Sequence, residues 1–119
     1  MKFFYMNSPK EAFVSVEDSL PVGATEIVAN SVEAAFEKHI PVVTRNGDSV
    51  HVEVGSVEHP MLDVHYIAFI ALVNGNNVMI KRLLPGDKPV ADFIYRGKPD
   101  EAEVYAFCNL HGLWVAKVQ

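Results

Sequence analysis

The sequence predicts an all-β protein, a β-sandwich that follows a small β module and a short helical turn, and three observations lead to this prediction. From Pro41 onward, short apolar runs follow one another at regular spacing. Glycine, proline and asparagine separate these runs, as they do in turns. In the run SVHVEV, residues 49–54, valines alternate with polar side chains, which is the period of a strand with one buried face. Short punctuated strands of this kind favour a sandwich over a parallel sheet.

The strands of the sandwich follow in order along the chain. The dipeptide Asn46-Gly47, a strong hairpin signal, joins the two extended runs within residues 41–55. HYIAFIALV, residues 65–73, is predicted to be a buried strand, and the turn VNGNN leads from it into VMIKRLL. After the turn LPGDKP comes the strand ADFIYRG. After the turn GKPDEA come the strands EVYAFC and GLWVAKV, residues 103–108 and 112–118.

The first 38 residues have a different character. KFFYM and AFVSV, residues 2–6 and 12–16, are predicted to form a small hairpin, followed by a loop around SLPVGAT. NSVEAAFEKH, residues 30–39, predicts one or two helical turns. Asn30 is the expected N-cap, and Glu33 stands three residues later, as in a capping box. This helical turn would deliver the chain into the sandwich.

The composition narrows the range of functions. Half of the residues are hydrophobic and 21% are charged, which supports a packed core. The net charge of −5 argues against nucleic acid or an anionic membrane as the main partner. No apolar run is long enough to span a membrane, and the apolar stretch in MKFFYMNSPKEAF is too short for a secretion signal. The one cysteine excludes an internal disulfide and fits a reducing interior, so a cytoplasmic protein is expected.

The five histidines and the one cysteine are the residues of greatest chemical interest. His51 lies on the polar face of its strand beside Glu53, and we expect it to be an ordinary surface histidine. Pro60 keeps its segment extended, so the histidines on either side of HPMLDVH lie on a loop and not on one helical face. The four histidines other than His51, like Cys108, stand at the ends of predicted elements: His39, His59, His65 and His111.

Loop ends at one rim of a sandwich converge in space, so these side chains predict a metal site. A thiolate among imidazoles suits iron, copper or zinc. Four nitrogens and one sulfur exceed the ligand sets of structural zinc and of blue copper, and they suit a five-coordinate iron with an open position. At this point three alternatives remain: a non-catalytic module with structural zinc, an iron electron carrier, and a hydrolase built on Cys108 and His111.

Four motifs resemble the superoxide reductase family, whose members are also called desulfoferrodoxins and neelaredoxins. They are EKHIPVV (37–43), GSVEHPMLDVHYI (55–67), LLPGDKP (83–89) and CNLHGLW (108–114). The resemblance implies an immunoglobulin-like sandwich of seven strands. It also implies one iron ion per chain, with four equatorial imidazoles and one axial thiolate, supplied by His39, His59, His65, His111 and Cys108.

The resemblance further implies an enzyme that reduces superoxide to hydrogen peroxide with one electron and two protons. Lys38 would attract the superoxide anion and orient a water that delivers a proton. Glu37 would cap the open position of the ferric iron. An external donor, in this family a rubredoxin, would supply the electron. A homo-oligomer, either a dimer or a tetramer, is also expected.

Many members of this family carry an N-terminal desulforedoxin-like module in which cysteines hold a second iron. The corresponding positions fall near Phe3, Met6, Ser19 and Leu20, and none is cysteine. The sequence therefore resembles the subgroup that keeps the module without its metal. We expect residues 1–36 to form this module, residues 37–119 to form the iron-binding domain, and no second iron centre to exist.

Overall fold

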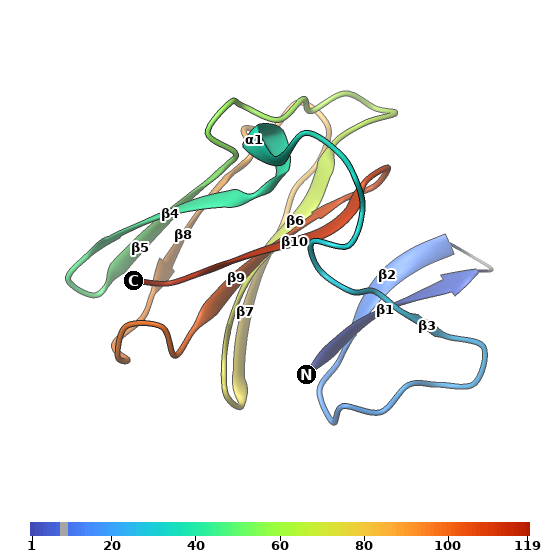
Figure 1. The fold of residues 1–119 in the computed structure, drawn as a ribbon, viewed down its shortest axis with the longest axis horizontal. Coiled ribbons are helices and arrows are strands. Elements are labelled where there is room, and N and C mark those ends of the chain that lie inside the picture. The colour runs from blue at the N-terminus through green and yellow to red at the C-terminus, as the bar shows by residue number, and fades with distance from the viewer. Residues whose placement is uncertain (8–9) are drawn as a thin grey trace.

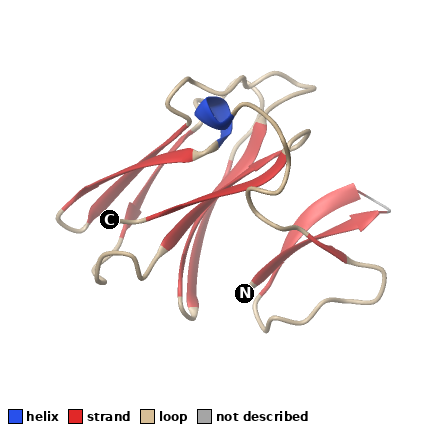
Figure 2. Cartoon of the chain, in the orientation of Figure 1, coloured by secondary structure: helices blue, strands red, loops and turns tan. Residues whose placement is uncertain are grey.

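The structure, a computed structural model that describes residues 1–7 and 10–119, is almost entirely β, as the sequence predicts (Figures 1 and 2). Strands make up nearly all of the regular structure, and one short helix interrupts them. In chain order the elements are β1 Lys2–Asn7, β2 Lys10–Ser15, β3 Thr25–Glu26, α1 Phe36–His39, β4 Pro41–Asn46, β5 Ser49–Val54, β6 Ile67–Asn74, β7 Asn77–Arg82, β8 Val90–Ile94, β9 Glu103–Cys108 and β10 Gly112–Lys117.

Two antiparallel sheets form the sandwich. One sheet has the strand order β4–β5–β8, and the other has the order β10–β9–β6–β7. This is the immunoglobulin arrangement, in which the first, second and fifth strands face a sheet built on the third, sixth and seventh. Side chains from both inner faces meet in one core, which includes Val52, Ile70, Val104 and Cys108. The predicted sandwich of seven strands is confirmed.

The two predicted hairpin turns lie where the glycines stand. Asn46 pairs with Ser49 across Gly47, and Asn74 pairs with Asn77 across Gly75. The φ angles of these two glycines are 60° and 54°. A two-residue hairpin loop requires such positive φ values, which glycine adopts without steric cost.

Three connections meet at one end of the sandwich, in the upper part of Figure 1. The helix α1 leads into β4, residues 55–66 join β5 to β6, and residues 109–111 join β9 to β10. Two strand pairs end here, because Pro41 pairs with Val54 and Ile67 pairs with Cys108. Side chains just beyond these pairs are therefore brought together, although they are far apart in the sequence.

The N-terminal segment forms its own sheet, in the order β2–β1–β3. β1 and β2 pair as the predicted hairpin, whose turn at residues 8–9 lies outside the described residues. One face of this sheet packs on the outer face of the β10–β9–β6–β7 sheet. We call the shared apolar residues the outer cluster, whose buried members are Phe3, Ala71, Phe107 and Leu113. The N-terminal sheet thus covers part of the outer face of the sandwich.

Phe3 is central to this packing. It stands near a position where the resemblance places a metal-binding cysteine, and it is only 4% exposed. Its ring stacks on Phe69 with 5.7 Å between the centroids, and it lies 4.8 Å from the ring of Tyr105. Apolar contacts therefore attach this sheet to the sandwich. The division of the chain into residues 1–36 and 37–119 stays a prediction, since the outer cluster joins the two parts.

One helical turn is present, as predicted, but it starts only at Phe36, and the prediction that Asn30 caps it is wrong. Ala35 occupies the N-cap position of α1 and makes no side-chain cap. Asn30 instead has a φ angle of 57° and pairs with the edge strand β10. Its Oδ1 accepts the Val115 N–H at 2.9 Å, and its own N–H donates to the Leu113 carbonyl at 2.9 Å. Asn30 thus satisfies backbone groups of an otherwise open edge strand.

We expect Phe3→Ala to lower the free energy of unfolding by about 3–5 kcal/mol, because truncating a buried aromatic ring leaves a cavity. Phe13→Ala is the matched control, since Phe13 lies on the neighbouring strand but is 40% exposed. Urea unfolding of the two variants measures the difference, and the control should lose much less stability. Equal losses would contradict the role given to Phe3 in attaching the N-terminal sheet.

Candidate metal centre

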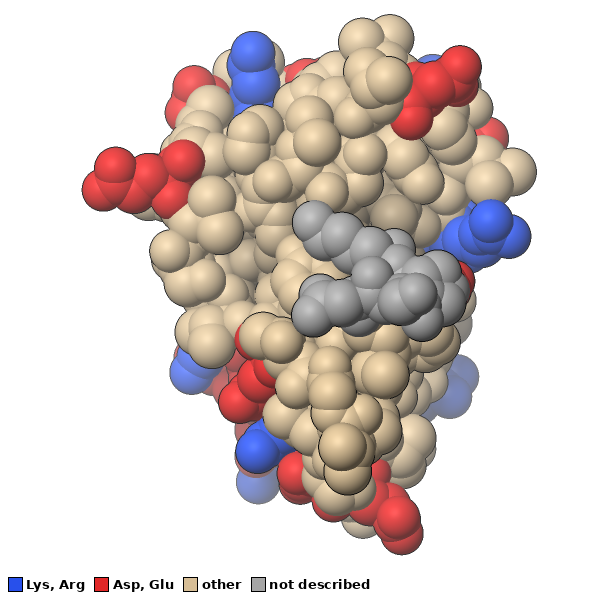
Figure 3. Space-filling model, turned by 90° about the vertical axis from the view of Figure 1, so that its right-hand side faces the viewer, with Lys and Arg blue, Asp and Glu red and all other residues tan. Residues whose placement is uncertain are grey.

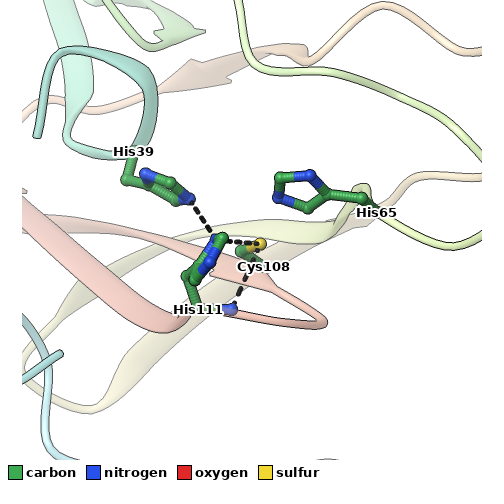
Figure 4. A group of neighbouring side chains, drawn as sticks. All are labelled: His39, His65, Cys108 and His111. Carbon is green, nitrogen blue, oxygen red and sulfur yellow. Dashed lines mark hydrogen bonds between the residues drawn. The ribbon is translucent and has the colours of Figure 1, made fainter. Parts of the chain in front are cut away.

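Four potential metal ligands converge at the loop end of the sandwich (Figure 4). His39 ends α1, His65 lies just before β6, Cys108 ends β9, and His111 lies in the turn before β10. Their ligand atoms all lie within 4.8 Å of one another. The structure therefore brings together four of the five ligands that the sequence predicts, in a group able to hold one metal ion.

His59, the fifth predicted ligand, borders this group. It is 1% exposed, and its ring centroid lies 4.7 Å from those of both His39 and His65. Its Nε2 atom is 3.3 Å from Nε2 of His39. The loop position predicted for His59 and His65 is observed, since both precede β6 and neither lies on a helix. The role of His59 as a ligand stays a prediction.

Backbone carbonyls orient two of these rings. Nδ1 of His39 lies 2.7 Å from the Ala35 carbonyl, and Nδ1 of His59 lies 2.7 Å from the Pro60 carbonyl. Each Nδ1–H therefore donates outward, which leaves Nε2 of the neutral ring with a free lone pair. The free nitrogen of His39 lies 3.1 Å from Nδ1 of His111. Nitrogens with inward lone pairs at such distances suit a shared cation.

His65 gives a direct test of whether these residues fit a metal ion. Its Nε2 atom is buried and has no hydrogen-bond partner among residues 1–7 and 10–119. An unsatisfied buried polar group costs about 1–3 kcal/mol. Coordination of a metal ion would offset this cost. The unpartnered nitrogen, placed among two other imidazoles and a thiol, shows that the residues fit a metal ion.

The thiol of Cys108 is fully buried at the end of β9. Burial raises its pKa, and hydrogen bonds from the backbone amides of His111 and Leu110 act in the opposite direction. The His111 N–H donates to Sγ at 3.4 Å. Such amide donors stabilise a thiolate, and a bound metal ion would complete its deprotonation.

The buried histidines are held in their neutral form. Burial lowers the pKa of His39, His59 and His65, and the pKa of His59 falls to about 4. The mutual proximity of the rings lowers these pKa values further. Since a metal ion binds the neutral imidazole, the rings are ready for coordination near pH 7.

Trp114 positions two of the candidate ligands, a role that the sequence analysis did not predict. It is fully buried, and its indole Nε1–H donates to the His111 carbonyl at 3.1 Å. Its ring centroid lies 4.9 Å from that of His39. The sequence offered one indication of this role, because Trp114 stands three residues after His111, at the end of CNLHGLW.

Asn109 holds together the two loops that carry His65 and Cys108. Its Oδ1 accepts the Tyr66 N–H at 2.9 Å, and its Nδ2 donates to the Val64 carbonyl at 3.0 Å. The role of this side chain was not predicted from the sequence. Its position beside Cys108 in the sequence does not reveal this contact, because only the tertiary structure shows that its amide faces the loop of His65.

Gly55 allows α1 to approach the β5–β6 connection closely. A Cβ atom at this position would lie 2.7 Å from the Glu37 carbonyl oxygen, which is shorter than side chains tolerate. The same carbonyl accepts the Val57 N–H at 2.8 Å. The absence of a side chain at Gly55 therefore helps to fix the helix that ends in His39.

Glu37 and Lys38, the predicted catalytic pair, are exposed on α1 directly before His39. The charge of Glu37 raises the pKa of His39, whereas the charge of Lys38 lowers it. Lys38 also lowers the pKa of His65. Both charges are thus close enough to act on the site, and their catalytic roles stay predictions.

His51 lies apart from the site, on β5, as expected for a surface histidine. Its Nδ1 is 2.7 Å from the Asp92 carboxylate, and its Nε2 is 3.3 Å from that of Glu53. These carboxylates raise the pKa of His51, whereas the pKa values of His39, His59 and His65 are lowered. The structure gives no reason to include it among the ligands.

A β-sandwich whose loop end gathers imidazoles around one thiol defines a class of metalloprotein with a single mixed nitrogen and sulfur centre. The sequence model described as desulfoferrodoxin matches residues 31–117. The chain is 47% identical over 93 residues to the desulfoferrodoxin of Clostridium acetobutylicum, covering 78% of this chain and 72% of that protein. The chain belongs to the desulfoferrodoxin family.

Two further comparisons connect this family to superoxide reductases. The superoxide reductase of Pyrococcus horikoshii is 34% identical over 100 residues, covering 70% of this chain and 87% of that protein. The crystal structure of the superoxide reductase of Treponema pallidum matches with a TM-score of 0.74 at 34% identity, covering 98% of this chain and 99% of that chain. This second likeness therefore extends over the N-terminal sheet as well as the sandwich. No helix in the described part of the chain has the length and apolar character needed to cross a membrane.

We expect the metal-free protein to lose stability as the pH falls from 6.5, the ordinary pKa of histidine, toward about 4, the pKa of His59. In this range the unfolded chain binds protons more readily than the folded chain, so protonation favours unfolding. His51, whose pKa is raised, contributes in the opposite direction.

Urea midpoints of the metal-free protein at pH 7 and pH 5 measure this loss. His51→Gln is the control, and it should make the loss steeper because it removes the opposing contribution. A midpoint that stays constant in this control would show that the ligand histidines are not buried in their neutral form.

Proposed function

We propose that this protein is a superoxide reductase, which adds one electron and two protons to superoxide to give hydrogen peroxide. One iron ion per chain would be bound by His39, His59, His65, His111 and Cys108. The observation that carries the proposal is the meeting of inward imidazole nitrogens, including the unpartnered Nε2 of His65, with the buried thiol of Cys108. Membership of a family whose relatives include superoxide reductases supports the same function.

Bound iron would supply the electron and an open position for the anion. The protein holds the ligands in the form that this chemistry needs. Outward hydrogen bonds fix the tautomers of His39 and His59, and Trp114 holds His39 and His111 in place. The sulfur of Cys108, with the His111 amide beside it, would donate electron density to the metal.

Lys38 would bring the substrate to the site. A chain of net charge −5 repels superoxide on average, so a local positive charge is needed. The Lys38 side chain is exposed beside His39, and its charge acts on both His39 and His65. We assign to this ammonium group the attraction of superoxide and the orientation of a water that delivers a proton.

Glu37 would close the site to other anions after turnover. Its side chain is exposed next to that of Lys38, whereas its backbone carbonyl is held by Val57 and Ser56. The backbone of the helix is therefore anchored while the carboxylate remains at the surface. We assign to this carboxylate the capping of the open position in the oxidised state.

The electron would come from a separate protein. Cys108 is the only cysteine, so the chain cannot build a second centre from four thiolates. A small electron carrier such as a rubredoxin is the proposed donor. A homo-oligomer, a dimer or tetramer, in the cytoplasm completes the proposal.

The decisive experiment is rapid mixing of superoxide with iron-loaded protein that has been purified anaerobically. One peroxide per superoxide is expected, without release of oxygen, and Cys108→Ser should lose nearly all activity and the colour of the oxidised protein. Superoxide that decays at its spontaneous rate in the presence of bound iron would instead indicate an electron carrier. Bound zinc in place of iron would indicate a non-catalytic module.

We expect Lys38→Ala to slow the second-order reaction with superoxide by roughly a factor of ten at low ionic strength, because local charge steers anions. The dependence of the rate on ionic strength should also become flatter. Lys117→Ala is the matched control, since Lys117 is exposed at the far end of β10 from His111. If both variants slow the reaction equally, Lys38 has no special role.

A further inference from the structure

We infer that a groove between the N-terminal sheet and the sandwich binds a small planar aromatic molecule that carries an anionic group. The groove has a volume of about 570 Å³ and is lined by residues of β1, β2, β6, β7 and β9. Volumes of about 300–1,000 Å³ are typical of small-molecule sites. This binding site lies outside the metal centre and goes beyond the proposed reduction of superoxide.

The groove exists because the N-terminal sheet covers only part of the outer face of the sandwich. Phe69 pairs with Arg82 and Ala71 pairs with Ile80, and directly opposite residues of an antiparallel pair share one face. Phe69 and Ala71 belong to the outer cluster, so Ile80 and Arg82 are on the outer face as well. Ile80 nevertheless remains 47% exposed.

The aromatic lining of the groove determines the shape of its occupant. The ring planes of Phe3 and Phe69 differ by 16°, and those of Phe69 and Phe107 differ by 13°. The centroid distances are 5.7 Å and 5.4 Å. Aromatic rings that line a groove favour contact with another flat ring system.

Arg82 determines the charge of the occupant. Its side chain has no hydrogen bond or ion pair among the residues that the structure describes. A guanidinium group binds carboxylate, sulfonate or phosphate through paired N–H donors. Glu11 also lines the groove, but Ala12 and Val14 face the sandwich, so the alternation of β2 places the Glu11 side chain on the opposite face of its strand.

The surface around the groove agrees with this chemistry. Figure 3 views the molecule from the side of the N-terminal sheet, and residues other than Lys, Arg, Asp and Glu make up most of the visible face. An apolar site with a cation at its edge suits an amphipathic anion better than a fully charged ligand. Tyr66 and Asn109 also line the groove, and they directly follow His65 and Cys108. An occupant would therefore lie beside the loops of the metal centre.

Two fluorescent probes test the proposal on the metal-loaded protein. 8-Anilinonaphthalene-1-sulfonate should bind at one site per chain, and N-phenyl-1-naphthylamine, which has the same rings without the sulfonate, should bind more weakly. Arg82→Gln should weaken sulfonate binding about two- to fivefold, as expected for one exposed ion pair, and leave the neutral probe unaffected. Arg96→Gln is the control, because Arg96 is exposed beyond β8 and pairs with Asp48.

A second pair of variants changes the charge on the exposed face without removing a buried residue. Ile80→Glu should weaken sulfonate binding and Ile80→Lys should strengthen it. Equal affinity for both probes in the wild type and in Arg82→Gln would overturn the proposal. The dimer fraction can be measured by sedimentation at increasing protein concentration. Probe binding that falls as this fraction rises would also overturn the proposal, since the groove would then be an interface between two copies of the chain. Neither readout depends on superoxide reduction.

Discussion

The register of two strand pairs determines whether the candidate metal ligands can meet. Ile67 pairs with Cys108, so the loop that carries His65 runs beside the turn that carries His111. Pro41 pairs with Val54 in the other sheet, so the end of α1 lies beside the loop before β6. Because the side-chain period of a strand is two, a slip of one residue in β9 would move Cys108 from the core to the outer face. The approach of His65 to Cys108 and His111 therefore depends on this register.

Local patterns in the sequence predicted the strands of the sandwich and the N-terminal hairpin, but not β3, which begins in the segment expected to be a loop. They also identified four histidines and Cys108 as candidate ligands. Gly47 and Gly75 mark turns whose chemistry acts over a few residues, and the valines around His51 give the period of a half-buried strand. The role of Asn30 could not be predicted, because its partner Val115 on β10 lies 85 residues away. An asparagine side chain that can cap a helix can equally bond to the backbone of an edge strand. Only the tertiary structure determines which of the two contacts forms.

The N-terminal sheet and the segment that follows it are attached to the sandwich at two places. Phe3 is buried in the outer cluster, and Asn30 attaches the following segment to β10. Apolar packing and backbone pairing therefore hold the module against the sandwich. Its contacts with Phe107 and Leu113 fall on either side of the turn from Cys108 to His111. The module thus supports, from outside, the backbone that presents two of the candidate ligands.

Burial divides the site into a neutral interior and a charged surface. The low pKa values of His39, His59 and His65 keep these rings neutral near pH 7, whereas the raised pKa of Cys108 keeps its thiol protonated. Binding of a metal ion to these groups therefore displaces one proton, from sulfur, because the imidazoles have none to lose at their inward nitrogens. Glu37 and Lys38 remain exposed on α1, directly before His39. The neutral imidazoles of His39, His59 and His65 thus lie beside a helical turn that carries two exposed charges.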